Sequence, residues 1–264
     1  AVTDPRDGRR VALKKLPNVF QSLVSSKRVF RELKMLCFFK HENVLSALDI
    51  LQPPHLDFFQ EIYLEICDFG LARVEEPDSS KHMTQEVVTQ YYRAPEILMG
   101  AKHYTAAVDV WSVGCIFGEL LGRRILFQAQ NPVQQLELIT ELLGTPSLDD
   151  MKYACEGAKT HMLRRAPKPP SLSAFYTLSS QATHEVVHLL CQMLVFDPDK
   201  RISVVDALAH PYLDEGRLRY HSCMCKCCYT TASGMRQYTS EFETTAPQGF
   251  DDHWEKKLTS VQHV

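Results

Sequence analysis

The strongest constraint on the fold is the order in which strand-like and helix-like segments follow one another. Strand-like segments cover residues 11–16, 44–51 and 58–63, which are rich in apolar side chains; Pro17 ends the first, and Pro53-Pro54 separates the other two. An amphipathic helix is predicted between the first two, with a cap at Ser25 or Ser26. This pattern predicts a small β-rich part at the start of the chain.

Helical patterns follow a loop-like stretch that runs from Gly70 to Pro95. Asn131-Pro132 is predicted to begin a helix, because asparagine caps helices and proline suits their first position, and Gly144 is predicted to close it. The apolar period predicts another helix over residues 181–195. Strands first and helices afterwards indicate the α+β class, with two unequal lobes.

Three regions are expected from this order. Residues 1–63 form a β-rich N-terminal lobe, and residues 64–213 hold the long loop and a helical lobe. Residues 214–264 are rich in Thr, Ser and Gly and are expected to be largely irregular. A chain of 264 residues with 45% hydrophobic residues is long enough to bury a sizeable core.

Composition argues against two classes of partner. The net charge is −3 and the basic residues are scattered, so neither nucleic acid nor a membrane surface is expected as a partner. The most apolar stretch, residues 106–121, is interrupted by Asp109, Ser112 and Glu119, which predicts a buried helix rather than a membrane span. Residues 1–10 show no signal-peptide pattern.

The cysteines favour free thiols over disulfides. There are nine, an odd number, and five of them lie singly inside apolar patterns, as buried thiols in a reducing compartment do. The other four lie within residues 223–228. A zinc site there, completed by His221, is the alternative, but no second Cys/His pair has zinc-ligand spacing, so structural or incidental thiols are favoured.

Two short motifs point to a chemistry. Asp68-Phe69-Gly70 follows an apolar strand, and Ala94-Pro95-Glu96 follows a loop that contains threonine. Either triplet alone is common in turns, but in this order the two resemble the activation segment of protein kinases. In those enzymes a carboxylate holds Mg²⁺ against the nucleotide phosphates, so the resemblance implies that Asp68 is the metal ligand.

Lys14 ends a Val-Ala-Leu-Lys sequence that resembles the third strand of protein kinases. The resemblance implies that Lys14 neutralises the ATP phosphates and that Glu32, on the next helix, positions this lysine. The alternative is a solvated lysine and a surface glutamate, because charges on amphipathic elements usually face water. With Asp68 downstream, the ion pair is the favoured interpretation.

Further segments are similar to the mitogen-activated and cyclin-dependent kinases. Residues 89–96 resemble the substrate-binding loop of that group, and residues 109–115 resemble its central helix. Residues 142–147 resemble the start of the group's insert, and residues 197–201 resemble a late helix. The Nemo-like branch is matched by Thr84-Gln85-Glu86, by the Ala-Gln run after Phe127 and by the cysteine-rich run near the C-terminus. The likeness covers nearly the whole chain.

By its position in this resemblance, Thr84 is the activating phosphorylation site. A phosphate adds about two negative charges and three acceptor oxygens, which suit arginines, and Arg31 and Arg73 are the candidates to receive it. Glu86 would be a permanent negative charge where relatives need a phosphotyrosine, and Arg93 would meet it. The alternative for Glu86 is a solvated loop carboxylate.

The same resemblance implies an ion pair between Glu96 and Arg201 that ties the substrate loop to the helical lobe. It also implies ATP and Mg²⁺ as cofactors, and transfer of phosphate to serine or threonine before proline in protein substrates. Transcription factors as substrates, an upstream activating kinase, a role in Wnt signalling and residence in cytoplasm and nucleus follow from the Nemo-like likeness alone.

Several parts of a kinase are absent from the sequence. No Gly-x-Gly-x-x-Gly precedes Lys14, and no His-Arg-Asp with its loop asparagine occurs anywhere. The break is placed at Tyr63–Leu64, because residues 59–63 resemble the fifth strand and residues 64–67 the strand just before Asp68. In the family the hinge, two helices and the catalytic loop separate those strands. The expected fold is therefore an incomplete bilobal kinase fold.

Three interpretations stay open for the chain. It descends from an ATP-dependent kinase and is itself catalytically impaired, because the catalytic-loop Asp and Asn are missing. It is a shortened, non-catalytic isoform that binds kinase partners through its helical lobe. Or it is an incomplete gene model that lacks an exon.

Overall fold

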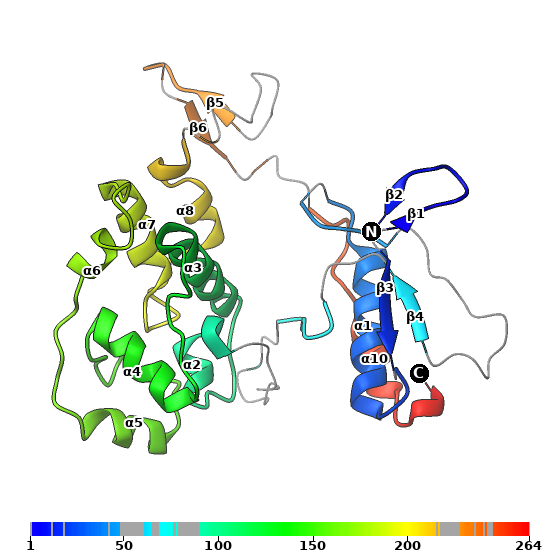
Figure 1. Ribbon diagram of the computed structural model, residues 1–264, viewed down its shortest axis with the longest axis horizontal. Coiled ribbons are helices and arrows are strands. Elements are labelled where there is room, and N and C mark those ends of the chain that lie inside the picture. The colour runs from blue at the N-terminus through cyan, green and yellow to red at the C-terminus, as the bar shows by residue number, and fades with distance from the viewer. Residues whose placement is uncertain are drawn as a thin grey trace. The chain divides into compact units, whose positions relative to one another are not determined.

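The computed structural model (Figure 1) describes residues 2–11, 13–17, 19–41, 43–47, 61–64, 69–75, 78, 90–214, 216, 228–234, 236–239, 241 and 245–263. Contacts divide the chain into two compact units. The N-terminal unit is Ala1–Val74 with Thr244–Val264, and the helical unit is Glu75–Glu243. The region boundaries predicted after residues 63 and 213 rest on sequence motifs rather than on contacts, and they stay a prediction.

The N-terminal unit contains two small antiparallel sheets. Strand β1 (Val2–Thr3) pairs with β2 (Arg10–Val11), and β3 (Lys14–Pro17) pairs with β4 (Glu61–Leu64). The strand predicted over residues 11–16 is therefore divided between β2 and β3. The Tyr63–Leu64 join lies inside β4, as does the end of the strand predicted over residues 58–63.

The strand predicted over residues 44–51 differs from the structure in its described part. Residues 44–47 contain only a single bridge, between His41 and Val44, while residues 48–51 lie outside the described residues. Bridging back to His41 forms a tight local turn, which the apolar composition of the segment does not reveal. A hydrophobic run by itself does not identify its pairing partner.

Helix α1 (Leu23–Phe38) begins earlier than predicted. Its cap is Ser22, whose backbone is extended and whose side chain accepts a hydrogen bond from the Ser25 amide at 3.1 Å. The prediction of Ser25 or Ser26 as the cap is wrong. Both already lie in the helix, and Ser26 is buried with its hydroxyl donating to the Val19 carbonyl at 2.9 Å.

Part of the C-terminal extension, which was expected to be largely irregular, packs against α1. Helix α10 (His253–Lys257) and the 3-10 turn η5 (Val261–His263) end the N-terminal unit, next to α1 in Figure 1. The Trp254 ring lies 4.9 Å from Phe30, and the Phe250 ring lies 5.3 Å from Phe38, measured between centroids. Two aromatic side chains in a polar segment supply the contact area, and no periodic pattern signals them in advance.

The helical unit consists mainly of helices. They are η2 (Gln90–Tyr92), α2 (Pro95–Leu98), α3 (Ala107–Gly122), α4 (Pro132–Leu143), α5 (Glu156–Leu163), α6 (Ser173–Tyr176), α7 (His184–Met193), α8 (Val204–Leu208) and η3 (Pro211–Leu213). Strands β5 (Cys228–Thr230) and β6 (Arg236–Tyr238) pair with each other. Strands with one long helix in one unit and helices in the other confirm the α+β class.

Three helix predictions are confirmed in the helical unit. Asn131 caps α4 by accepting from the Gln134 amide at 2.9 Å, and Gly144 ends it with a φ of 83°, a backbone angle that favours glycine. The apolar stretch over 106–121 forms α3, and none of the described helices is long and apolar enough to cross a membrane. Helix α7 covers the middle of the predicted 181–195 segment, and Thr183 caps it.

The core of the helical unit lies around α3. Trp111, Phe127, Ile139, Phe175 and Leu190 are among its fully buried side chains. Helices α3 and α7 approach closely where α3 carries a glycine: a Cβ atom on Gly114 would lie 2.9 Å from side-chain atoms of both Met193 and Leu194. Glycine is therefore required at this crossing of the two helices.

Candidate functional site

The best-defined part of the candidate site is the ion pair between Glu96 and Arg201. Glu96 lies in the first turn of α2, directly after Pro95. Its two carboxylate oxygens accept hydrogen bonds from the two terminal nitrogens of Arg201 at 2.9 and 3.0 Å. Both side chains are buried, with exposures of 4% and 0%. The pair expected from the sequence is present, in a bidentate geometry.

Arg201 joins several segments because every guanidinium nitrogen has an acceptor. Besides Glu96, it donates to the carbonyls of Val195 and Ala107 at 2.9 and 2.7 Å. Its guanidinium carbon also lies 5.3 Å from the centre of the Trp111 ring. A buried charge needs this degree of hydrogen bonding to be tolerated, and here the bonds connect α2, α3 and the loop before α8.

The segment before Pro95 is held to α3 by hydrogen bonds. The Tyr92 hydroxyl donates to Glu119 at 2.7 Å, and the Ser112 hydroxyl donates to the Tyr92 carbonyl at 2.9 Å. The bond to the Glu119 carboxylate raises the pKa of Tyr92, because it stabilises the protonated phenol. The α3 residues that make these contacts follow Tyr92 by about two dozen positions, so spacing could not reveal them.

Helix α4 also holds this segment. The Gln135 amide donates to the Tyr91 carbonyl at 3.2 Å, and the Gln90 amide donates to the carbonyl of Ala129, just before α4, at 3.2 Å. Gln135 is fully buried although it is polar. A glutamine in the middle of an amphipathic helix gives no sequence signal of this role. The result is a rigid platform that carries the Ala-Pro-Glu motif.

The predicted nucleotide and metal residues are only partly described. Lys14 begins β3, opposite Leu64, but its side chain lies outside the described part, and so does all of Asp68. Glu32 is described and is buried in α1. A Lys14–Glu32 ion pair and Mg²⁺ binding by Asp68 therefore stay predictions.

The structure pairs Arg31 with a carboxylate of the chain itself. Its Nε donates to Glu255 at 2.9 Å, a second nitrogen also contacts Glu255, and Nη1 donates to the Gly70 carbonyl at 2.7 Å. Arg31 is 3% exposed. Arg31 thus connects α1 to the C-terminal segment and to the glycine after Phe69, and a phosphate on Thr84 would have to displace Glu255 to reach it.

The other predicted regulatory residues are placed as follows. Thr84 and Glu86 lie outside the described residues. Arg73 is partly buried and donates to the Ala72 carbonyl at 2.9 Å. Arg93 follows η2 and is partly buried. The pairing of Arg73 with a phosphate and of Arg93 with Glu86 stays a prediction.

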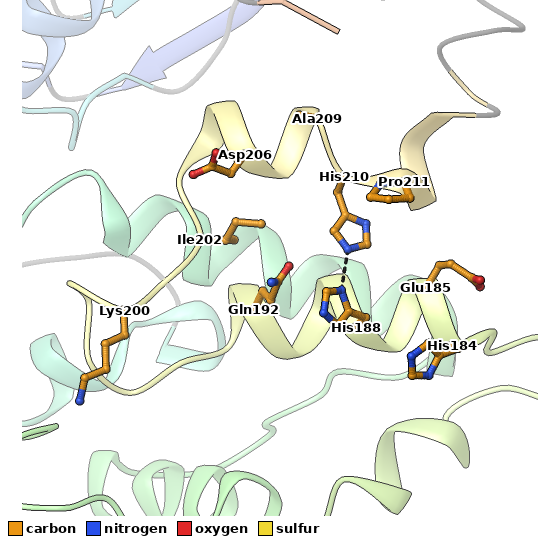
Figure 2. Close-up of a pocket in the computed structure, with 10 residues that line it drawn as sticks. All are labelled: His184, Glu185, His188, Gln192, Lys200, Ile202, Asp206, Ala209, His210 and Pro211. Atoms are coloured by element: carbon orange, nitrogen blue, oxygen red, sulfur yellow. Dashed lines mark hydrogen bonds between the residues drawn. The ribbon is translucent and has the colours of Figure 1, made fainter. Parts of the chain in front are cut away.

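A cavity of about 590 Å³ lies beside α7 and η3, and three of the residues that line it are histidines (Figure 2). His210 Nδ1 accepts from the Tyr212 amide at 3.1 Å, so its proton is assigned to Nε2, which lies 2.8 Å from His188 Nδ1. His184 Nδ1 lies 3.0 Å from the Tyr176 hydroxyl. Both ring nitrogens of His210 are used in these bonds, and within the described residues the three histidines do not form a group with metal-ligand spacing, so the cluster is interpreted as a structural connection.

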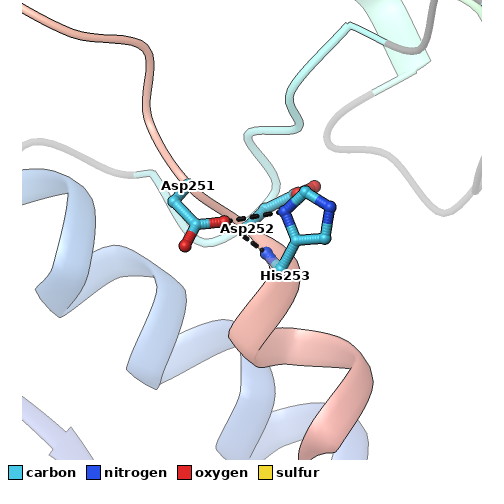
Figure 3. A group of neighbouring side chains, drawn as sticks. All are labelled: Asp251, Asp252 and His253. Carbon is cyan, nitrogen blue, oxygen red and sulfur yellow. Dashed lines mark hydrogen bonds and ion pairs between the residues drawn. The ribbon is translucent and has the colours of Figure 1, made fainter.

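Two groups of aspartate or histidine side chains in the described part have the spacing of metal ligands, and each takes part in hydrogen bonds or ion pairs within the chain. Figure 3 shows the first, where Asp251 accepts a hydrogen bond at 2.9 Å from the amide of His253, the first residue of α10. This bond lowers the pKa of Asp251. The second group is Asp149, Asp150 and Asp197, whose charges are balanced by Lys152 and Lys200. The zinc alternative at the cysteines of residues 223–228 with His221 stays untested, because of these residues only the backbone of Cys228, at the start of β5, is described.

Cys115, in the middle of α3, is a buried thiol as the sequence predicts, whereas the same prediction is wrong for Cys37 and Cys155, which are exposed. Burial raises its pKa to about 12. At pH 8 only about one thiol in ten thousand is then ionised, and the thiolate is the reactive form. Iodoacetamide should therefore modify the exposed Cys37 and Cys155 and leave Cys115 unmodified, as mass spectrometry of the peptides would show.

The control for this prediction is labelling in denaturant, where all three cysteines should react. Equal labelling rates of Cys115 and Cys155 in the folded protein would contradict the burial of Cys115.

A helical unit that anchors an Ala-Pro-Glu motif through a buried glutamate–arginine pair has the organisation expected of a kinase C-terminal lobe. Residues 56–213 match the family model described as the protein kinase domain. The chain belongs to the protein kinases and, within them, to the mitogen-activated group of serine/threonine kinases, on the Nemo-like branch. Its fold is an incomplete version of the kinase fold.

The relatives support this assignment at several distances. The serine/threonine-protein kinase NLK2 of Xenopus laevis is 61% identical over 325 positions, which cover 100% of this chain and 72% of the relative. The serine/threonine kinase NLK of Caenorhabditis elegans is 49% identical over 325 positions, covering 99% and 51%. Mitogen-activated protein kinase 10 of Arabidopsis thaliana is 36% identical over 274 positions, covering 81% and 69%.

The comparison with NLK2 also measures a gap. The alignment runs over 325 positions, whereas the chain has 264 residues, so at least 61 aligned positions have no residue in this chain. These positions belong to the relative's aligned segment. The missing hinge and catalytic loop inferred from the motifs are consistent with a gap of this size.

Proposed function

We propose that this chain derives from an ATP- and Mg²⁺-dependent kinase that phosphorylates serine or threonine before proline, and that the chain itself transfers phosphate inefficiently. The observation that carries the proposal is the gap of at least 61 positions, combined with the absence from the sequence of the His-Arg-Asp and its asparagine. In kinases that aspartate accepts the proton of the substrate hydroxyl, and the asparagine holds a second Mg²⁺.

The roles of the kinase residues that the chain retains support the same proposal. Lys14 and Asp68 would hold the phosphates and the metal, with Glu32 positioning Lys14. The buried Glu96–Arg201 pair would hold the substrate loop in place. Binding groups without the proton acceptor can position a substrate but lose the part of catalysis that proton transfer contributes.

The test is phosphate transfer from labelled ATP to a protein substrate with Ser-Pro sites, with NLK2 of Xenopus laevis as the positive control. Because general base catalysis contributes about 10²–10⁴-fold, the chain should be slower than NLK2 by at least about that factor. Any residual transfer should vanish in Asp68→Asn and persist in Asp252→Asn, a control aspartate that is not part of the proposed metal site. Transfer as fast as that of NLK2 would refute the proposed impairment.

A second candidate function is non-catalytic binding of kinase partners, and an exposed apolar groove on the helical unit favours it. An incomplete gene model is the remaining explanation, and the transcript across the Tyr63–Leu64 join distinguishes the two. Intervening codons would restore an ordinary kinase, whereas a direct join would support the shortened chain.

Regulation and location enter the proposal from kinship. We infer phosphorylation of Thr84 by an upstream kinase, transcription factors as substrates, a role in Wnt signalling and residence in both cytoplasm and nucleus. Phosphate mapping on protein from cells and microscopy of a tagged chain would test these inferences. If Thr84 carries no phosphate in cells in which the signalling pathway is active, the proposed regulation by phosphorylation of Thr84 would be wrong.

A further inference from the structure

One face of helix α3 carries an exposed apolar stripe. Val113, Ile116 and Leu120 are 51%, 48% and 62% exposed, although they lie on the helix that forms the centre of the core. Their spacing of three and four residues places them on one side of the helix. Scattered exposed apolar residues are ordinary, but a contiguous stripe of this kind marks an interaction surface.

The stripe is one wall of a groove. Helix α8 forms the other wall through Val204 and Leu208, and the buried Leu189 and Met193 of α7 form part of its floor. The groove encloses about 380 Å³ and its lining is almost entirely apolar. A groove between two helices with an apolar floor has the shape and chemistry that accept the apolar side of an amphipathic helix.

One charged group also lines the groove. Asp109 lies in the first turn of α3 and is exposed, while the neighbouring atoms desolvate its carboxyl in part and raise its pKa. Among the described residues, its carboxylate has no hydrogen-bond or ion-pair partner. A carboxylate beside an apolar groove attracts a cation or a hydrogen-bond donor, so the occupant should carry one near this end of the groove.

The alignment indicates where such an occupant comes from. The relatives have at least 61 positions that this chain lacks, enough for more than one helix, while this chain exposes an uncovered apolar stripe on its central helix. An uncovered stripe is what remains when the segment that covers it is absent.

We propose that the groove formed by α3, α7 and α8 binds, in trans, an amphipathic helix from the segment that Nemo-like kinases carry and this chain lacks. The apolar side of that helix lies on Val113, Ile116 and Leu120, and a basic or amide side chain meets Asp109. The proposal deepens the non-catalytic candidate function by naming the surface and the partner.

The experiment uses the full 264-residue chain and labelled 20-residue peptides that tile the extra segment of Xenopus laevis NLK2. Fluorescence anisotropy should show that one peptide binds with a Kd on the order of 1–100 μM, a range typical of small apolar contacts. Leu120→Lys should weaken its binding at least about tenfold, because a charge replaces an apolar contact. Asp109→Asn should weaken it less.

The matched control is Leu163→Lys on α5, which has a similar exposure, 54%, and lies outside the groove. This variant should bind the peptide like the unmodified chain, and thermal unfolding should show that both lysine variants stay folded. Absence of binding by every peptide at 1 mM, or equal loss in both variants, would overturn the proposal.

Sedimentation velocity provides a further outcome. The chain could form a dimer that dissociates in the Leu120→Lys variant and that no peptide disrupts. That result would show that a second copy of the chain occupies the groove, and the proposal would be wrong. Because binding is measured without phosphate transfer, a catalytically active chain would refute the proposed impairment without deciding whether the groove binds the peptide.

Discussion

Replacing Arg201 with methionine should lower the free energy of unfolding of the helical unit by about 3–5 kcal/mol, the usual cost of removing one partner of a buried ion pair. The change leaves the Glu96 carboxylate buried without its bidentate partner and leaves the Val195 and Ala107 carbonyls without a donor. Since single domains are stable by only about 5–15 kcal/mol, much of the unit's stability would be lost. Urea denaturation followed by circular dichroism measures the effect.

Arg165→Met is the matched control for this prediction. Arg165 also pairs with a glutamate, Glu137, but its side chain is 42% exposed, so the same substitution should change stability by less than about 1 kcal/mol. The double variant Glu96→Leu with Arg201→Met should regain part of the loss, because no uncompensated charge then remains buried. An Arg201→Met variant as stable as Arg165→Met would contradict the assigned role of the pair.

Replacing Trp111 with alanine should destabilise the same unit by about 3–5 kcal/mol, through lost burial and the cavity that remains. Trp111 is fully buried and stacks on Phe127 with ring centroids 6.0 Å apart. The chain has only two tryptophans. In a Trp254→Phe reference protein, the fluorescence of Trp111 therefore reports the unfolding of the helical unit. Because the variants lack Trp111, their unfolding is followed by circular dichroism.

Trp111→Phe tests the cause of that effect. Phenylalanine keeps most of the ring packing and removes an indole N–H that has no hydrogen-bond partner within the described residues. The loss should therefore be smaller than for alanine, about 1–2 kcal/mol. If phenylalanine and alanine cost the same, packing around Trp111 would not be the source of the stability.

The elements that were predicted well share a local signal. Helix α4 has an asparagine, a proline and a glycine at the positions where capping requires them, and α3 is a single apolar stretch between polar neighbours. These signals act within a few residues of the backbone that they control. The prediction for the serine-rich start of α1 is wrong for the same reason: Ser22, Ser25 and Ser26 are all capable caps, and only packing at Ser26 separates them.

The candidate site divides in a similar way. The pair of Glu96 with Arg201 is predicted because the family resemblance implies it, and the structure shows this ion pair. The contact of Arg31 with Glu255 and that of Gln135 with the Tyr91 carbonyl were not anticipated. Arg31 and Glu255 are 224 residues apart, and nothing in their neighbouring sequence couples them.

The sequence by itself determined the class of the chain, the family to which it belongs and the motif residues, because capping, apolar period and motif order are written in short segments. The tertiary structure alone decided which charges are buried together, where the C-terminal segment packs, and that α3 leaves one apolar face open. Those outcomes depend on which distant surfaces meet and exclude water, and burial of that kind is a property of the packed chain rather than of any segment in it.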